Sequence, residues 1–288
     1  MMTDEQGISG MNNYEFIALS LKEDVGDGDH TSLACIDETA TGKAHVKIKE
    51  DGVVAGVTLA TQILNQVDNR IVAKVKMQEG VIVKKGDIVI DIEGNIQSIL
   101  KAERLLLNCM QRMSGIATLT RKMVEKISGT RAKLLDTRKT TPNFRFFEKQ
   151  AVKIGGGYNH RFGLFDMIMI KDNHIDACGG ITKAIGKANE YLVSKNKNLQ
   201  IEIETRNLDE VREVLGCGNI HRIMLDNFTT DQLKEAVHLI NNKFETEASG
   251  GITFENIREV SESGVDFISV GALTHSYKSL DISLKMIR

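Results

Sequence analysis

The sequence has little of several things that would place a protein in a specialised class. Its 288 residues include no tryptophan, a single proline and four cysteines, and no two cysteines form a C-x-x-C pair. This spacing argues against a disulfide framework and against a clustered zinc site. The net charge is only −2, so no overall field attracts nucleic acid or an acidic membrane, and any site for anions must be local.

Features of membrane and secreted proteins are also missing. No uninterrupted apolar run approaches the roughly 18 residues of a membrane span. The first ten residues, MMTDEQGISG, are polar and acidic, unlike a signal peptide. We therefore expect a cytoplasmic protein. The content of 41% hydrophobic and 26% charged residues is typical of a soluble globular protein, and the length fits one large α/β domain or two modest ones.

Residues up to about 115 have a mixed pattern. Helical spacing of apolar residues predicts helices at 13–24 and 98–113, and alternation predicts strands at 44–50 and 71–77. Residues 79–94 predict two further strands around the turn 84–87, similar to the hairpins of biotinyl and lipoyl carrier domains. The turn lacks a lysine motif such as D-K-A or M-K-M, so the similarity indicates a sandwich topology.

After residue 115, helices and strands alternate. Helices are predicted at 116–127, 144–154, 181–195, 208–215, 229–241 and 253–263, and strands at 132–137, 166–172, 199–205, 222–227, 246–250 and 266–272. This rhythm predicts a parallel sheet with helices outside it, which a doubly wound sheet or a closed barrel would satisfy. No G-x-G-x-x-G follows the first strand, which weakens the doubly wound alternative. Polar residues at the strand ends favour the barrel, because barrel enzymes collect catalytic groups from several strands.

The only proline, Pro142, lies in a segment that gathers positive charge. Between Arg138 and Lys171, seven lysines and arginines are opposed by two acidic residues, a local balance of +5. Lys149 and Lys153 are four residues apart, and we expect them on an exposed helix face. Crowded cations repel one another unless an anion joins them, so we expect a substrate with several negative charges. The cations expected to converge on it are Arg138, Lys139, Arg161 and Lys171.

Carboxylates follow on later strands. Glu202 and Glu204 are two residues apart and share one strand face, and Asp226 ends the next strand. A buried carboxylate is costly unless it is paired or binds a cation. One alternative is an internal ion pair with Lys171 or Arg138. The other is a site that binds Mg²⁺, or stabilises developing positive charge, beside the anion pocket.

The last two predicted strands end in small residues. Such residues expose backbone N–H groups near helix N-termini, which is how barrels bind phosphate after their final strands. Among the seven histidines none has metal-ligand spacing, and His160, after three glycines and before Arg161, is the best functional candidate. No G-x-S-x-G motif occurs, and we expect Cys109 to be a packing residue. The candidate phosphate residues are Ser249, Gly250, Gly251 and Gly271.

These motifs occur in the order of a known family. The segments DTRKTTP, GGGYNHRFGLFDMIMIKDNH, IEIET, IMLDNF, EASGG and SVGALTHS resemble those of quinolinate phosphoribosyltransferases, also called nicotinate-nucleotide pyrophosphorylases (carboxylating). LKEDVGDGDHTS and AERLLLNCMQRMSGIAT are similar to further signatures of this family. The resemblance implies an α+β open-sandwich domain at residues 1–115, to which residues 274–288 return. It also implies an incomplete α/β barrel of the type II phosphoribosyltransferases at residues 116–273.

The resemblance further implies a reaction and the residues for it. Quinolinate and phosphoribosyl pyrophosphate would give nicotinate mononucleotide, pyrophosphate and CO₂ in NAD biosynthesis, in an obligate homodimer with Mg²⁺ as cofactor. Lys139, Lys171, Glu204 and Asp226 would be catalytic, and the two acids would also hold Mg²⁺ with substrate phosphates. Arg104 would reach into the neighbouring subunit's site. The implied substrate-binding residues are Arg104, Thr137, Arg138, Lys139, His160, Arg161, Lys171, Glu204, Asp226, Ser249, Gly250, Gly251 and Gly271.

Two other functions are open from the sequence. The related molybdenum-transport-associated family shares the fold and many motifs, but the complete set of dicarboxylate-binding cations disfavours it. Equal affinity for quinolinate and nicotinate would support that alternative. A carrier or scaffold function of the hairpin around Gly86 predicts a covalent adduct on Lys84 or Lys85, which intact mass spectrometry would detect.

Overall fold

The computed structural model describes residues 12–287, and the prediction about a signal peptide concerns residues outside this range. The described residues form two compact units. The first comprises the chain as far as Arg121, residues Thr140–Gly156 and the segment from Ser276. The second comprises Lys122–Lys139 and Gly157–His275. Within residues 12–287, no helix combines the length and the apolar character needed to cross a membrane.

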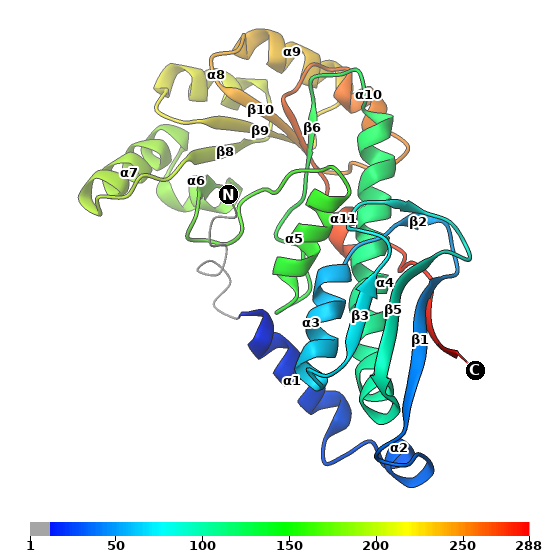
Figure 1. Ribbon diagram of the computed structural model, residues 1–288. Coiled ribbons are helices and arrows are strands. Elements are labelled where there is room, and N and C mark those ends of the chain that lie inside the picture. Colours follow the sequence, from blue (N-terminus) through cyan, green and yellow to red (C-terminus); the bar gives the residue numbers. More distant parts are fainter. Residues whose placement is uncertain (1–11, 288) are drawn as a thin grey trace. The chain divides into compact units, whose positions relative to one another are not determined.

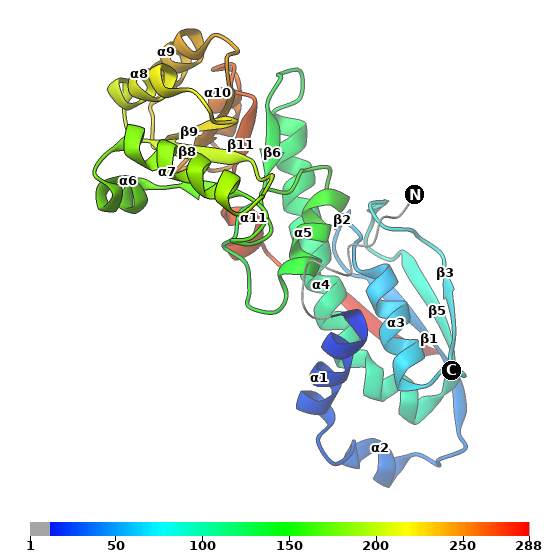
Figure 2. The same cartoon turned by 90° about the vertical axis from the view of Figure 1, so that its left-hand side faces the viewer.

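The first unit is built on an antiparallel sheet of four strands, in the order β12-β1-β5-β3, beside a separate pair β2-β4. The strands are β1 (Thr41–Ile48), β2 (Gly52–Val53), β3 (Val72–Val75), β4 (Ile82–Val83), β5 (Ile88–Asn95) and β12 (Ile282–Ile287). The helices are α1 (Asn13–Val25), α2 (His30–Cys35), α3 (Val57–Val67), α5 (Arg145–Ile154) and most of α4 (Ile96–Lys126). Figures 1 and 2 show α3 and α4 on the same face of the four-stranded sheet.

Most elements predicted for this unit are present, with two differences. Strands β4 and β5 flank the predicted turn, but β4 pairs with β2 while β5 pairs with β1 and β3, so the two are not a hairpin. Residues 98–113 and 116–126, predicted as parts of two separate helices, belong to the single helix α4, which ends one residue before the second prediction. Gly115 does not break this helix. A Cβ there would lie 2.3 Å from the carbonyl oxygen of Lys278, so glycine allows the C-terminal segment to pack closely on α4.

Helix α5 follows β6 in the chain but is buried within the first unit. The ring of Phe147 lies 4.8 Å from that of Phe16 and 5.1 Å from that of Phe144, centroid to centroid. The prediction that Lys149 lies on an exposed face was wrong, because Lys149 is only 3% exposed. The buried side of α5 extends over residues 147–149 and 151–152, and this leaves Lys153 exposed as predicted.

The second unit contains a parallel sheet of six strands in the order β6-β11-β10-β9-β8-β7 (Figure 1). The strands are β6 (Lys133–Leu135), β7 (Ile168–Ile170), β8 (Ile201–Thr205), β9 (Arg222–Asp226), β10 (Glu245–Ser249) and β11 (Phe267–Ser269). The helices are α6 (Asp172–Cys178), α7 (Ile181–Ser194), α8 (Leu208–Cys217), α9 (Thr230–Ile240), α10 (Ile257–Ser261) and α11 (Ala272–His275).

This arrangement confirms the predicted fold class, a mixed α/β protein with an incomplete barrel. Among the described strands, β6 and β7 are the two edges and do not pair with each other. Helices α8 and α9 begin just after the strands that precede them because their first turns are capped. Asn207 accepts a hydrogen bond from the N–H of Glu210, and Thr229 accepts one from that of Gln232. Short helices α2, α6 and α11, and the longer α3, were not predicted.

Candidate active site

The polar residues at the strand ends of the second unit lie along one edge of the sheet. All strand pairs of this sheet are parallel, so their carboxyl ends meet at the same edge. In sheet order from β6 to β7, the predicted residues at this edge are Thr137, Arg138 and Lys139, then Gly271, then Ser249, Gly250 and Gly251, then Asp226, then Glu204, and finally Lys171. The parallel topology therefore places these predicted residues along the same edge of the sheet, and the convergence of their side chains on one pocket stays a prediction.

Lys139 lies directly against the end of β11. A Cβ on Gly271 would be 2.9 Å from Cδ of Lys139 and 3.0 Å from Nε2 of His275. The hydroxyl of Thr274 donates a hydrogen bond of 2.8 Å to the carbonyl oxygen of Lys139, whose own N–H donates to Oγ1 of Thr137 at 3.0 Å. Glycine at position 271 is thus what allows the lysine to pass over the strand end.

Asn227 joins the ends of β9 and β10. Its N–H donates to the carbonyl oxygen of Ser249 at 2.9 Å, and its amide donates to Oδ2 of Asp226 at 2.6 Å. A Cβ on Gly250 would be 2.3 Å from the Asn227 side chain, and Gly250 and Gly251 have φ angles of 86° and 61°. Only glycine fits these two positions without strain, so they leave backbone, not side chain, facing the site edge next to Asp226.

Lys171 and Glu204 form an ion pair at the other end of the edge. The Nζ of Lys171 lies 3.2 Å from Oε2 of Glu204, which is 8% exposed. The internal ion pair that we considered for a strand-end carboxylate is therefore present for Glu204. Asp226 is partly exposed at the end of its strand. Its carboxylate oxygens are hard ligands of the kind that Mg²⁺ binds. The donor set of Glu204 and Asp226 fits Mg²⁺, which binds one or two carboxylates together with substrate phosphates.

Arg138 and Arg161 lie close enough to affect each other electrostatically. Burial lowers the pKa of the Arg161 guanidinium, and the positive charge of Arg138 lowers it further. The side chain of Arg161 is held by a hydrogen bond of 3.2 Å from Nη1 to the carbonyl oxygen of Met167. An anion bound between the two guanidinium groups would offset the repulsion that Arg138 exerts on Arg161.

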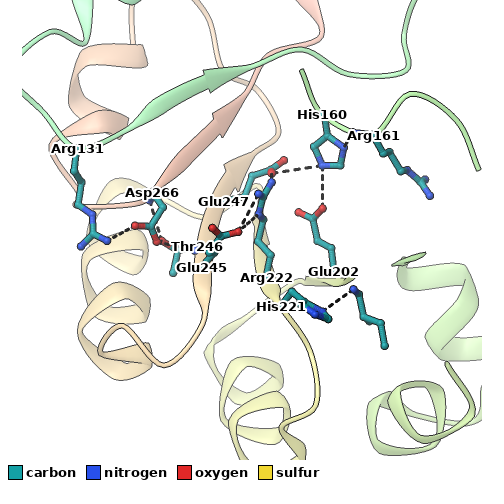
Figure 3. A network of polar contacts seen from close by, with 11 residues as sticks. Arg131, His160, Arg161, Glu202, His221, Arg222, Glu245, Thr246, Glu247 and Asp266 are labelled. Atoms are coloured by element: carbon teal, nitrogen blue, oxygen red, sulfur yellow. Dashed lines mark hydrogen bonds and ion pairs between the residues drawn. The ribbon is translucent and has the colours of Figure 1, made fainter. Parts of the chain in front are cut away.

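His160 is buried beside Arg161, above a cluster of acids (Figure 3). Its Nε2 lies 2.9 Å from Oε2 of Glu202 and 3.5 Å from Oε2 of Glu247. Nη1 of Arg222 donates to Glu247 at 2.8 Å, and Nη2 donates to Glu245 at 3.0 Å. Burial raises the pKa of Glu202 and that of Glu247 to about 7 each, although Arg222 opposes the shift for both.

Sequence reasoning missed Arg222 and gave Glu247 no role. Arg222 stands four positions before the predicted strand-end residue Asp226, and Glu247 stands two positions before Ser249. Both side chains are buried, like that of Glu202. A charged residue at an interior position of two adjacent strands was the available signal. Asp136 was also missed as an anchor: its buried carboxylate accepts hydrogen bonds from the N–H of His160 at 2.9 Å and from Asn159 at 2.5 Å.

Arg104 is not among the residues gathered in the second unit. It lies on α4 in the first unit and is exposed. This position neither supports nor opposes the implied role in a second subunit.

Comparisons with known proteins cover both units. Residues 29–114 match the family model described as the quinolinate phosphoribosyl transferase N-terminal domain, and residues 116–285 match that of the C-terminal domain. The chain is 50% identical over 285 residues to the chloroplastic nicotinate-nucleotide pyrophosphorylase (carboxylating) of Arabidopsis thaliana, covering 94% of this chain and 81% of the relative. It is 42% identical over 262 residues to a probable nicotinate-nucleotide pyrophosphorylase of Bacillus subtilis, covering 91% and 89%. The solved nicotinate-nucleotide pyrophosphorylase from Francisella tularensis is 38% identical, with a TM-score of 0.91 over 99% of this chain and 100% of that one.

Proposed function

We propose, from the premise that the chain belongs to the quinolinate phosphoribosyltransferase family, that the strand-end edge of the second unit carries out the family's reaction. In that reaction quinolinate and phosphoribosyl pyrophosphate give nicotinate mononucleotide, pyrophosphate and CO₂. The residue roles that follow rest on the geometry of this chain.

The observation that carries the assignment is the pair of guanidinium groups of Arg138 and Arg161. Each arginine presents a planar fork that matches a carboxylate, and the two together match the adjacent carboxylates of quinolinate. A ligand with two negative charges would also relieve the repulsion that lowers the pKa of Arg161. Nicotinate, with one carboxylate, would leave one guanidinium without an anionic partner.

The sugar phosphate would bind along the β9–β11 end of the edge. Ser249, Gly250 and Gly251 offer backbone N–H groups to the 5′-phosphate, and Gly271 lets Lys139 reach the same region. Asp226 would accept hydrogen bonds from the ribose hydroxyls. When bound, Mg²⁺ would neutralise the diphosphate that leaves, and Asp226 and Glu204 are the residues that would hold it.

The reaction develops positive charge twice, first on the ribose and then on the pyridine ring. Pyrophosphate leaves the anomeric carbon through a state that resembles an oxocarbenium ion, as in glycoside cleavage. Glu204 is the carboxylate that would stabilise this charge electrostatically. Attack by the pyridine nitrogen then gives a pyridinium whose 2-position can lose CO₂. Lys139, whose side chain passes over the end of β11, is the cation to which we assign the electrostatic assistance of this loss.

The site would be completed by a second copy of the chain. Arg104 is exposed on α4, and we propose that in a homodimer it supplies a further cation to the site of the neighbouring subunit. The alternative of a molybdenum-transport-associated protein is disfavoured by the relatives, since those described above are pyrophosphorylases at 42–50% identity.

The experiment is product analysis with purified protein. Quinolinate labelled at its 2-carboxylate is incubated with phosphoribosyl pyrophosphate and Mg²⁺, and nicotinate mononucleotide and labelled CO₂ are quantified. We expect the two products in equal amounts, and no CO₂ when nicotinate replaces quinolinate. Absence of both products, or turnover of nicotinate as fast as quinolinate, would refute the proposal.

A further inference from the structure

His160 has both of its ring nitrogens engaged inside the protein. Nδ1 accepts a hydrogen bond of 2.7 Å from the backbone N–H of Arg161. Nε2 lies 2.9 Å from a carboxylate oxygen of Glu202. Only 5% of the side chain is exposed, so the ring is surrounded by protein and not by solvent.

These contacts determine the protonation state of the ring. A nitrogen that accepts a hydrogen bond must keep its lone pair, so Nδ1 carries no proton. The single proton of the neutral ring is then on Nε2, where it faces the carboxylates of Glu202 and Glu247. His160 is therefore neutral and adds no positive charge to the neighbouring arginines.

Two buried acids face the His160 ring, and Arg222 holds one of them. Glu202 on β8 and Glu247 on β10 are both completely buried, and Arg222 on the strand between them binds Glu247 at 2.8 Å. Arg222 is in turn held by Glu245 and by the ring of Phe267, whose centroid lies 3.9 Å from its Cζ. Figure 3 shows these contacts, from Glu245 through Arg222 and Glu247 to His160, which also contacts Glu202.

A metal ion is a poor explanation for this cluster, although His160, Glu202 and Glu247 together could supply three ligand atoms. The guanidinium of Arg222 already lies beside Glu247, and a second cation there would be repelled. A metal on Nε2 would also displace the proton that the neutral ring carries there. Moving this proton to Nδ1 would break the hydrogen bond from Arg161.

His160 fixes the backbone of Arg161 through hydrogen bonds. The N–H of His160 donates to the buried carboxylate of Asp136, and its ring receives the N–H of Arg161. The Arg161 side chain has a second fixed point at the carbonyl oxygen of Met167. We propose that His160, locked by Glu202, is a positioning residue that holds the Arg161 guanidinium ready for a substrate carboxylate, and that it does not bind substrate itself. This inference rests on the proposed function for the role of Arg161.

The first test compares quinolinate KM with kcat in four variants. Glu202→Leu removes the carboxylate that lies 2.9 Å from Nε2 of His160. His160→Ala removes the acceptor for the Arg161 N–H. Each should raise the quinolinate KM several-fold, up to roughly tenfold, which is the scale of one lost hydrogen bond. His160→Asn retains an oxygen close to the position of Nδ1 but cannot reach Glu202, so it should restore part of the affinity that His160→Ala loses. Glu245→Gln changes only the exposed partner of Arg222 and should stay within about twofold of the wild type.

A substrate-binding histidine would give a different pattern. His160→Asn would then be as damaging as His160→Ala, and Glu202→Leu would leave the quinolinate KM unchanged; either result overturns the proposal. Thermal unfolding by circular dichroism identifies a variant that fails to fold.

The second test needs no variant and no turnover. Nitrogen NMR of protein labelled with ¹⁵N-histidine reports which ring nitrogen carries a proton. We expect His160, assigned by its loss in His160→Asn, to show an unprotonated Nδ1 and a protonated Nε2, with and without quinolinate. An imidazolium signal, or a change of tautomer on adding quinolinate, would overturn the inference. Because this readout is independent of catalysis, an inactive wild type would refute the proposed function and leave the protonation of His160 measurable.

Discussion

The buried acid pair predicts that the stability of the protein falls as the pH rises towards neutrality. Glu202 and Glu247 are both completely buried, and burial raises the pKa of each to about 7 from an ordinary 4.5. The groups facing them are His160, Arg161, Arg222 and Glu245. The perturbation that isolates the pair is Glu247→Gln, which removes one carboxyl group and keeps an oxygen that can accept from Arg222.

The sign and the size follow from the pKa values. A carboxyl group with a raised pKa in the folded state contributes stability that is fully present below its unfolded pKa and is lost as the pH rises through the folded value. For one group, a folded pKa of about 7 against 4.5 corresponds to roughly 3 kcal/mol, at about 1.4 kcal/mol per pKa unit. The wild type should therefore lose a few kcal/mol between pH 5 and pH 8. Glu247→Gln should lose about half as much, because it removes one of the two buried acids, while burial, the main cause of the raised pKa, still acts on Glu202.

The assay is urea denaturation at a series of pH values from 5 to 8. The chain has no tryptophan, so circular dichroism reports unfolding better than fluorescence. Carboxylates with a lowered pKa, such as Asp68 at about 2, change stability only at lower pH and do not interfere. The matched control is Glu245→Gln, whose carboxylate is half exposed and which should keep the wild-type slope. Parallel curves for the wild type and Glu247→Gln would refute the reasoning.

Three further predictions concern catalysis. Glu204→Gln should lower kcat about a hundredfold, the scale of a lost electrostatic stabiliser, while quinolinate KM changes little; a large rise in KM with unchanged kcat would contradict its role. Arg104→Ala and Arg138→Ala should each be inactive, yet an equal mixture refolded together should recover about a quarter of wild-type activity, because half of the dimers would have one intact site. No recovery would contradict a shared site. Removal of Mg²⁺ by a chelator should abolish activity and addition of Mg²⁺ should restore it; undiminished activity after chelation would exclude the metal.

Much of the fold could be predicted because local patterns agree with tertiary packing. The alternation of helices and strands after residue 115 reappears in the six parallel strands and their helices. The prediction divided α4 at the change of pattern near residue 115. The glycine at this position is explained by the backbone of Lys278, 163 positions later in the chain. Lys149 was placed on a solvated face for a similar reason: the spacing within a helix does not reveal which sides meet other parts of the unit.

The candidate site was predictable where chemistry coincides with strand ends. The edge formed by Lys139, Asp226, Glu204 and Lys171 needed only the rule that parallel strands end together. The buried ion pairs of Arg222 were not predictable, because Glu245 and Glu247 lie on another strand. In the sequence, Arg222 is one residue at the start of a predicted strand. Only the pairing of β9 with β10 shows that it lies opposite Glu245. Residue roles, the magnesium ion, the homodimer and the cytoplasmic location stay predictions.

The account depends most on a pocket in which Arg138 and Arg161 share one dianionic ligand. Isothermal titration calorimetry with quinolinate and with nicotinate measures this directly, without turnover and without the second substrate. We predict that quinolinate binds at least about tenfold more tightly than nicotinate, because a second charge-assisted hydrogen-bonded pair is formed. Equal affinities for the two acids would contradict the account.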